Sequence, residues 1–211
     1  MYAMKNKLLR DAVNEDLLID LLTTLPVNKF NEKRNFISVI LLYITGCRIN
    51  ELRNFNLLTI NKLIKTGSIM IHSYKTSTTR RIDISESEQL LLIKYEHIIN
   101  DIYSVLNPMD HLLMTSKRKE LSNSNAYILL NRILKKYGDK NGLTILSHSF
   151  RIGYITELLK TYNVQIAKSI IGHKQLDTTL RYDRNLLTSN EVKSIRNNLN
   201  SNKTLIKYLG Q

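Results

Sequence analysis

The sequence predicts a mixed α+β fold that is mostly helical and carries a small three-stranded antiparallel sheet. In most of the 211 residues, apolar side chains recur at helical spacing. Residues 62–84 instead hold three short β-prone runs separated by turns. With only 7 glycines and 2 prolines, the chain offers no linker that would divide it. We therefore expect one domain over residues 1–211, with a core over about 8–200 and a tail at 201–211.

The first half of the chain is predicted from leucine spacing and from one continuous apolar run. Leucines recur every three or four residues over 17–25, and Pro26 ends that helix. Residues 33–46 have almost no polar face, so this helix should lie at the centre of the core and end at Gly46. The predicted strands are residues 62–64, 68–72 and 81–84.

The second half is predicted to be helical, apart from loops. Ser85 caps a long helix that has Glu86 and Glu88 in its first turn, and Pro108 lies in a loop. The later helices are predicted at about residues 123–137, 149–161, 164–171 and 189–199.

The charge of the chain indicates a polyanionic partner. The 31 Lys and Arg exceed the 18 Asp and Glu by 13, and the pI is near 9.8. Residues 1–60 carry a net charge of +2 and residues 61–211 carry +11, so the binding surface should come from the later part. Nucleic acid is the commonest such partner. A composition rich in Ile, Asn and Lys is an alternative source of some of the lysine excess.

Several other classes of protein are excluded. The single cysteine excludes a disulfide framework and a Cys-rich zinc site. No apolar stretch is long enough to span a bilayer, and the N-terminus lacks the apolar core of a signal peptide. We expect a soluble intracellular protein with no membrane partner.

Two segments early in the chain place cations at turns. In TGCRINEL (residues 45–52), Gly46 ends the buried helix, and Glu51 lies three residues after Arg48, where it could hold the guanidinium. In YKTSTTRR (residues 74–81), a hairpin carries three cations and no acid. Taken alone, each segment is better explained as an exposed feature: a surface salt bridge for the first and a solvated turn for the second.

Two later segments carry histidines. In SHSFRIG (residues 147–153), His148 and Arg151 lie three residues apart and would share one helical face, where they could grip a phosphate. In IGHK (residues 171–174), Gly172 precedes His173, and Tyr182 follows nine residues later. Singly, these are weak signals, because the His–Arg pair also suits an ordinary capped helix.

Together and in this order, the four segments resemble the tyrosine recombinase (phage integrase) family, over about residues 15–185. The family pattern has an arginine in a Thr-Gly-x-Arg-x-x-Glu-Leu setting, a hairpin lysine, His-x-x-Arg, Gly-His and a C-terminal tyrosine. In this sequence the pattern falls on Arg48, Lys75, His148, Arg151, Gly172, His173 and Tyr182. The resemblance implies the DNA breaking–rejoining catalytic fold of that family.

The resemblance also implies roles for these residues. Tyr182 would attack the DNA phosphate and form a 3′-phosphotyrosyl link, while His148 accepts its proton. Lys75 would protonate the departing 5′-oxygen. The transition state would be stabilised by Arg48, Arg151 and His173, with Glu51 and Gly172 in support.

Further expectations concern the partners. The additional DNA contacts are expected from Arg80, Arg81, Lys174 and Arg181. Because the protein supplies the cations, we expect no metal, no other cofactor and no ATP. The expected partner is double-stranded DNA, bound at paired sites by a homotetramer.

Two departures from the family pattern leave alternatives open. Family members often have a histidine after the His-x-x-Arg arginine, where this chain has Ile152. Only about 45 residues precede Arg48, so we expect no separate N-terminal DNA-clamping domain, as in single-domain members. The alternatives are DNA relaxation like that of type IB topoisomerases and a catalytically silent DNA-binding regulator.

Overall fold

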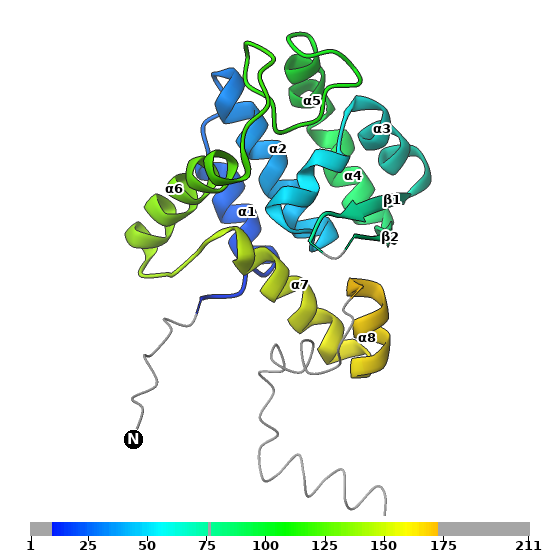
Figure 1. Cartoon of the computed structure of the whole chain (residues 1–211). Coiled ribbons are helices and arrows are strands. Elements are labelled where there is room, and N and C mark those ends of the chain that lie inside the picture. The colour runs from blue at the N-terminus through cyan, green and yellow to red at the C-terminus, as the bar shows by residue number, and fades with distance from the viewer. Residues whose placement is uncertain (1–9, 76, 173–211) are drawn as a thin grey trace, which may run out of the picture.

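The computed structural model describes residues 10–75 and 77–172 (Figure 1). Its elements are, in chain order, α1 (Glu15–Thr24), α2 (Phe30–Thr45), the 3₁₀ helix η1 (Ile49–Asn54), α3 (Leu57–Thr66), β1 (Ser68–Ser73), β2 (Thr78–Asp83), α4 (Glu86–Lys94), α5 (Glu96–Tyr103), α6 (Asn123–Asn141), α7 (Ser147–Thr161) and α8 (Val164–Ile171). None of the described helices is both long and apolar enough to cross a membrane.

Helix α2 runs through the centre of the molecule, as its apolar sequence predicts. From Phe36 to Leu42 every side chain is buried, and the helix packs against α5 and α7. The helix ends at Gly46, whose φ of 55° lies in the left-handed region that glycine adopts without strain. The turn that follows leads directly into η1.

The sheet has two strands in the described part of the chain, and not the three that the sequence predicts. β1 and β2 pair antiparallel, with Ser68 opposite Asp83 and Ser73 opposite Thr78. The expected first strand, residues 62–64, belongs instead to α3.

Residues 57–66 form a helix because capping at both ends and burial of one face favour it. The Asn56 side chain accepts a hydrogen bond from the Thr59 N–H at the start, and Gly67, with a φ of 65°, ends the helix. Ile60 and Leu63, three residues apart, are both buried on the same face. The local β-propensity of residues 62–64 is therefore overridden by capping and packing.

The long helix predicted after Ser85 is interrupted. The Ser85 cap is present, since its hydroxyl accepts from the Glu88 N–H. Tyr95 then leaves helical geometry and separates α4 from α5. Its ring packs edge-on against Phe36 at 4.8 Å between centroids, which lets the apolar face of α5 turn onto α2.

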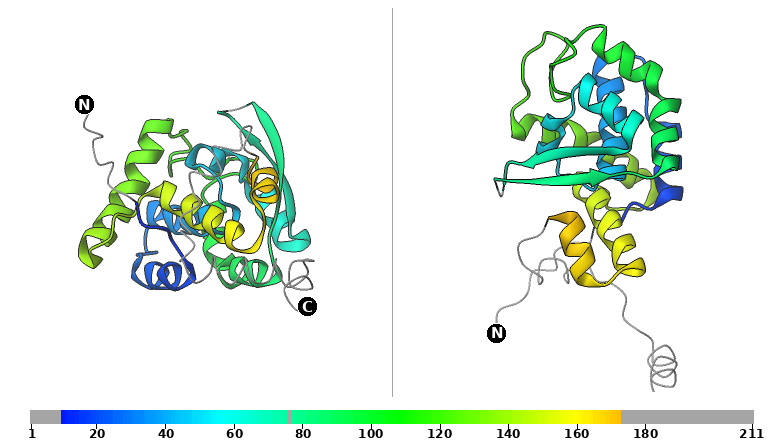
Figure 2. Two further views of the ribbon diagram at one scale, coloured as in Figure 1. Left: turned by 90° about the horizontal axis from the view of Figure 1, so that it is seen from below. Right: turned by 90° about the vertical axis from the view of Figure 1, so that its right-hand side faces the viewer.

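The last described helices largely match the prediction. α8 has the predicted bounds, α6 extends four residues further, and α7 begins two residues earlier and thus includes His148. The predicted helix 189–199 and the tail 201–211 lie outside the described residues. α8 packs against α7 and β2, so the hairpin and α8 lie side by side (Figure 2).

Candidate active site

The first group of site residues surrounds the turn after α2. Arg48 sits at the start of η1, and its Nη1 donates to Glu51 Oε1 at 3.0 Å. Its backbone N–H donates to the other carboxylate oxygen at 2.9 Å. The predicted pairing of Arg48 with Glu51 is confirmed, but it is not a surface salt bridge, because Glu51 is only 1% exposed.

Glu51 remains ionised among several cations. Burial alone would raise the pKa of Glu51. The hydrogen bond from the Arg48 N–H and the charges of Arg80, Arg151 and Arg48 outweigh burial and hold this pKa below its ordinary value. The carboxylate is thus the common counter-charge of three guanidinium groups.

Arg151 reaches the same turn from α7. Its Nη1 donates to the Gly46 carbonyl at 2.6 Å and its Nη2 to the Ile171 carbonyl at 3.5 Å. These carbonyls close α2 and α8, where the helix dipole is negative and a cation is stabilised. Arg151 is 1% exposed, so it binds the two helix ends together while its charge remains near Glu51.

His148 lies one turn before Arg151 on α7 and is partly buried. Burial lowers the pKa of His148 to about 4, and the charges of Arg10, Arg151, Arg48 and Lys75 act in the same direction. At neutral pH the imidazole is therefore uncharged and can accept a proton. Arg10 carries no motif in the sequence, and only the fold brings it into range.

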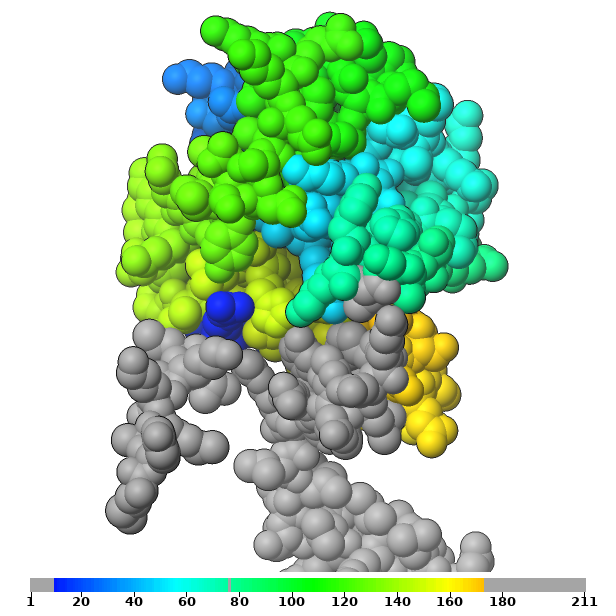
Figure 3. All heavy atoms as spheres, in the orientation of Figure 1, coloured from blue at the N-terminus to red at the C-terminus, as the bar shows by residue number. Residues whose placement is uncertain are grey.

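Lys75 is exposed at the tip of the β1–β2 hairpin. Its charge contributes to the lowered pKa of His148, so it lies within electrostatic range of that ring. In the space-filling view, the chain after α2 (cyan) forms a floor between the hairpin (teal) and the α6–α7 side (yellow-green) (Figure 3). The predicted Arg48, Lys75, His148 and Arg151 thus converge from three separate parts of the chain.

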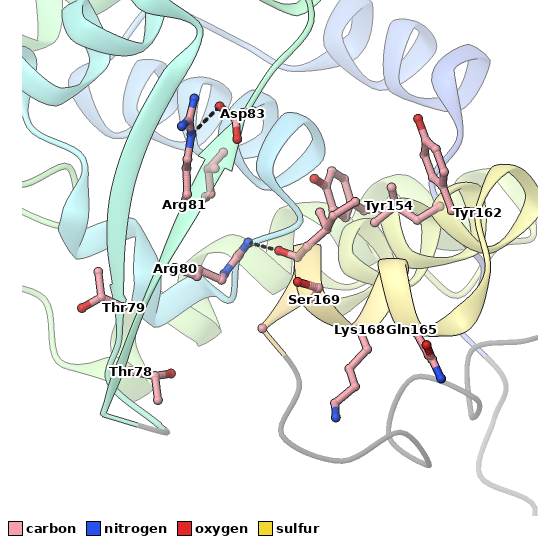
Figure 4. A pocket seen from close by; sticks show the side chains of 14 residues that line it. Thr78, Thr79, Arg80, Arg81, Asp83, Tyr154, Tyr162, Gln165, Lys168 and Ser169 are labelled. Atoms are coloured by element: carbon pink, nitrogen blue, oxygen red, sulfur yellow. Dashed lines mark hydrogen bonds and ion pairs between the residues drawn. The ribbon is translucent and has the colours of Figure 1, made fainter.

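Arg80 and Arg81 are neighbours on β2 but face opposite ways (Figure 4). Arg81 is 67% exposed at its side chain and pairs with Asp83 at 2.8 Å. The side chain of Arg80 is only 9% exposed and points toward Glu51 and the end of α8. Arg81 therefore lies where a DNA contact is sterically open, whereas the side chain of Arg80 is largely covered.

Gly172 ends α8 with a φ of 71°, which favours glycine. A Cβ at this position would lie 3.0 Å from Arg80 Cδ, so the absence of a side chain also leaves room for Arg80. The predicted site residues His173, Lys174, Arg181 and Tyr182 lie outside the described residues.

A cleft of about 1150 Å³ is lined by residues of β2, α7 and α8 (Figure 4). Besides Arg80 and Arg81, it is lined by Tyr154, Tyr162, Gln165 and Lys168. None of these last four belongs to the predicted site. Their place in the cleft depends on how the two helices pack against the hairpin, and no local pattern signals that.

Two known proteins are similar to this chain in sequence. The tyrosine recombinase XerA of Pyrococcus furiosus is 29% identical over 179 residues, which cover 84% of this chain and 58% of that protein. The TnP I resolvase of Bacillus thuringiensis is 30% identical over 153 residues, covering 72% of this chain and 50% of its own length. The present chain thus spans between half and three fifths of these relatives.

Solved structures share the fold. A crystal structure of XerA recombinase superposes with a TM-score of 0.64 at 20% identity, covering 89% of this chain and 64% of that one. The Tn1549 transposon integrase, in complex with transposon right end DNA, gives 0.65 at 18% identity, covering 89% and 65%. The model of the Phage integrase family matches residues 12–189, from before α1 to beyond the last described helix. The chain therefore belongs to the phage integrase family and has the catalytic fold of the tyrosine recombinases.

Proposed function

We propose that this protein is a site-specific recombinase that cleaves and rejoins double-stranded DNA through a 3′-phosphotyrosyl intermediate. The observation that carries the proposal is the convergence of Arg48 and Arg151 on the turn after α2, with His148 and Lys75 in electrostatic range. Membership of the phage integrase family supports the same reaction.

The cations suit the chemistry of a phosphodiester. The negative charge on the phosphate repels nucleophiles, and more charge builds on its non-bridging oxygens in the transition state. Fixed guanidinium groups at these oxygens lower the barrier, since they need no reorganisation during the reaction. Arg48 and Arg151 are held in place by Glu51 and by backbone carbonyls, which preorganises them for this role.

We assign one proton transfer to His148, which accepts a proton, and the other to Lys75, which donates one. Tyr182 attacks phosphorus, and the phenolic proton passes to His148, which is neutral at pH 7 because of its lowered pKa. The P–O5′ bond breaks, and Lys75 protonates the departing oxygen. Religation reverses these steps, so the phosphodiester energy is conserved and neither ATP nor a metal is required.

Recombination between two DNA sites needs more than one active site. We propose that the protein assembles as a homotetramer on paired sites, as the family resemblance implies, and that Arg81, Lys174 and Arg181 contact the DNA. The net charge of +11 over residues 61–211 supports DNA binding by this part of the chain.

A nicked suicide substrate tests the proposed reaction. Binding sites are first selected from a random-sequence duplex library and then synthesised with a nick beside the expected cleavage position, so that the cleaved strand diffuses away. In buffer containing EDTA, the wild-type protein should become covalently attached to DNA. Tyr182→Phe, which loses only a hydroxyl, should bind the same duplex equally well and form no adduct.

Other outcomes identify the alternatives. Binding without any adduct from the wild-type protein would indicate a DNA-binding regulator. An adduct accompanied by relaxation of supercoiled plasmid, without strand exchange between two sites, would indicate a topoisomerase. An adduct that persists in Tyr182→Phe would move the nucleophile to another tyrosine.

A further inference from the structure

Arg80 is a cation whose side chain is largely covered and turns away from the exposed side of β2. It lies in the middle of β2, opposite Ile71 of β1, and its side chain turns inward while that of Arg81 turns out. A long charged side chain that is nine-tenths buried is costly unless a partner compensates for the loss of water. The partners of Arg80 therefore indicate what its charge is for.

The contacts of Arg80 are all long. Nη1 donates to the Ile170 carbonyl at 3.4 Å (Figure 4). Nη2 donates to the Thr45 carbonyl at 3.4 Å and lies 3.6 Å from Glu51 Oε2. Within the described part of the chain, its Nε–H has no hydrogen-bond partner at all. These distances exceed those of strong charge-assisted hydrogen bonds, so the hydrogen-bonding capacity of the Arg80 guanidinium is only partly used.

The charge balance around Glu51 explains why a partly satisfied cation is useful. The Glu51 carboxylate binds Arg48 directly at 3.0 Å, so that pair alone presents little net charge to a phosphate. Arg80 approaches the second oxygen of the same carboxylate. With Arg151 nearby, three guanidinium groups face one carboxylate, which leaves an excess of two positive charges for an anion.

We propose that Arg80 is a positioning residue for DNA cleavage, which offsets the charge of Glu51 so that Arg48 presents a net positive charge to the scissile phosphate. This inference rests on the proposed recombinase function. Arg80 does not touch the DNA in this role and acts through the Arg48–Glu51 pair.

The carbonyl contacts of Arg80 parallel those of Arg151. Arg80 and Arg151 each donate to one carbonyl at the end of α2 and one at the end of α8, and the carbonyls they use are consecutive in each helix. The two side chains therefore span the same gap in parallel. Gly172 provides the space for Arg80, since a Cβ there would approach Arg80 Cδ to 3.0 Å.

The test compares Arg80→Gln with Arg80→Lys, using Lys33→Ala as the control, because Lys33 pairs with Asp101 at the opposite end of α2 from Gly46. Gln keeps hydrogen-bonding capacity and loses the charge, while Lys keeps the charge and loses the planar fork. Three quantities are measured: the Kd for an uncleaved duplex, the rate of covalent adduct formation, and the same rate on a substrate with a methylphosphonate at the scissile position. Thermal unfolding confirms that each variant is folded.

Cleavage of the methylphosphonate distinguishes the proposed electrostatic role from a purely structural one. Its neutral methyl group replaces one charged oxygen, so cleavage depends less on compensating cations. Arg80→Gln should bind duplex within about twofold of wild type and cleave the normal phosphate roughly 10²-fold more slowly, in the range of a lost oxyanion contact. On the methylphosphonate, the difference from wild type should shrink to less than about tenfold. Arg80→Lys should recover much of the rate, and Lys33→Ala should cleave both substrates at the wild-type rate.

Three results would overturn the proposal. An equal loss of rate on both substrates would indicate a structural role only, and parallel losses of binding and cleavage would indicate a DNA contact. A defect in Lys33→Ala as large as that in Arg80→Gln would indicate a general effect of net charge. If the wild-type protein forms no adduct on either substrate, the proposed function itself fails, and this inference fails with it.

Discussion

Glu51 and His148 are titratable groups packed among arginines, and both have pKa values below their ordinary range. The consequences are opposite. Glu51 remains ionised and can hold Arg48, whereas His148 remains neutral and can accept a proton. After losing its proton, a carboxyl group is charged and an imidazole is neutral. The same electropositive environment therefore suits Glu51 and His148 for different tasks.

Glu51→Gln tests the role of Glu51 as a shared counter-charge. We expect it to lower the free energy of unfolding by about 3 kcal/mol, because three guanidinium groups lose the charge of a carboxylate that they share. Urea unfolding at pH 7.5 measures this change. Asp83→Asn is the matched control, since it removes an exposed pair with Arg81 and should cost less than about 1 kcal/mol. Equal effects of the two substitutions would contradict the shared counter-charge.

The lowered pKa of His148 predicts how stability depends on pH. Between pH 6.5 and about 4, the unfolded chain binds a proton at His148 that the folded chain does not, so folded stability falls as the pH falls through this window. Wild-type protein should therefore lose more stability than His148→Gln between pH 7.5 and pH 5 in urea unfolding. The carboxylates are common to both proteins and cancel. His97→Gln, on an exposed position of α5, is the control, and equal losses in wild type and His148→Gln would count against the shift.

At the scale of elements, glycines end four of the described helices in the left-handed conformation. They are Gly46, Gly67, Gly142 and Gly172. Two of them do more than end a helix. Gly46 offers its carbonyl to Arg151 and lies against the Tyr154 ring, and Gly172 leaves room for Arg80. The helix ends therefore set the positions of the two buried arginines.

Gly46→Ala and Gly142→Ala separate conformational strain from this positioning role. Both glycines have a φ near +60°, so each alanine should cost about 1–2 kcal/mol of stability. A Cβ at Gly142 meets nothing within 4 Å, whereas a Cβ at Gly46 would overlap the Tyr154 ring. Gly46→Ala should therefore be the more destabilising by thermal unfolding. It should also slow adduct formation at least tenfold, while Gly142→Ala should cleave normally. Similar cleavage rates in both variants would contradict a role for the α2 end in placing Arg151.

At the scale of the whole molecule, the described residues form one main hydrophobic core and a small cluster where α8 meets α7. The main core extends from α1 to α7, and the second cluster contains Ile155, Ala167 and Ile171. α8 thus joins the body through few apolar contacts, supplemented by the hydrogen bonds of Arg80 and Arg151. The segment that α8 introduces carries His173 and Tyr182, so these hydrogen bonds connect the cations of the site to the start of that segment.

Assembly is tested by removing residues 201–211, in which Leu205, Ile206, Tyr208 and Leu209 are apolar. If this tail docks on a neighbouring protomer, the truncated protein should fold and bind a single site, but synapsis of paired sites and strand exchange should fail. Gel shifts and recombination of a two-site plasmid measure these steps. Alanine at the four apolar positions of the full chain should reproduce the defect. Normal recombination by the truncated protein would contradict docking in trans, and loss of folding would indicate that the tail packs on its own domain.

The sequence by itself determines the elements whose signals are local. Caps and spacing predict α2, α8 and the Ser85 helix start, and the order of the four segments predicts the family and the pairing of Arg48 with Glu51. Helix caps and side chains three or four residues apart interact within one turn, so a local pattern is enough to predict them.

Only the tertiary structure decides features that depend on contacts between distant segments. Residues 62–64 are β-prone but join α3, because burial of Ile60 and Leu63 outweighs local propensity.

Arg80 and Arg81 are indistinguishable as adjacent cations in the sequence. Strand alternation turns one toward Glu51 and the other toward solvent, and the pairing of β2 with β1 and the packing of α8 on β2 decide which is which. The pKa values of Glu51 and His148 likewise depend on charges that reach them from other elements, and electrostatic energy depends on distance in space and not on distance along the chain.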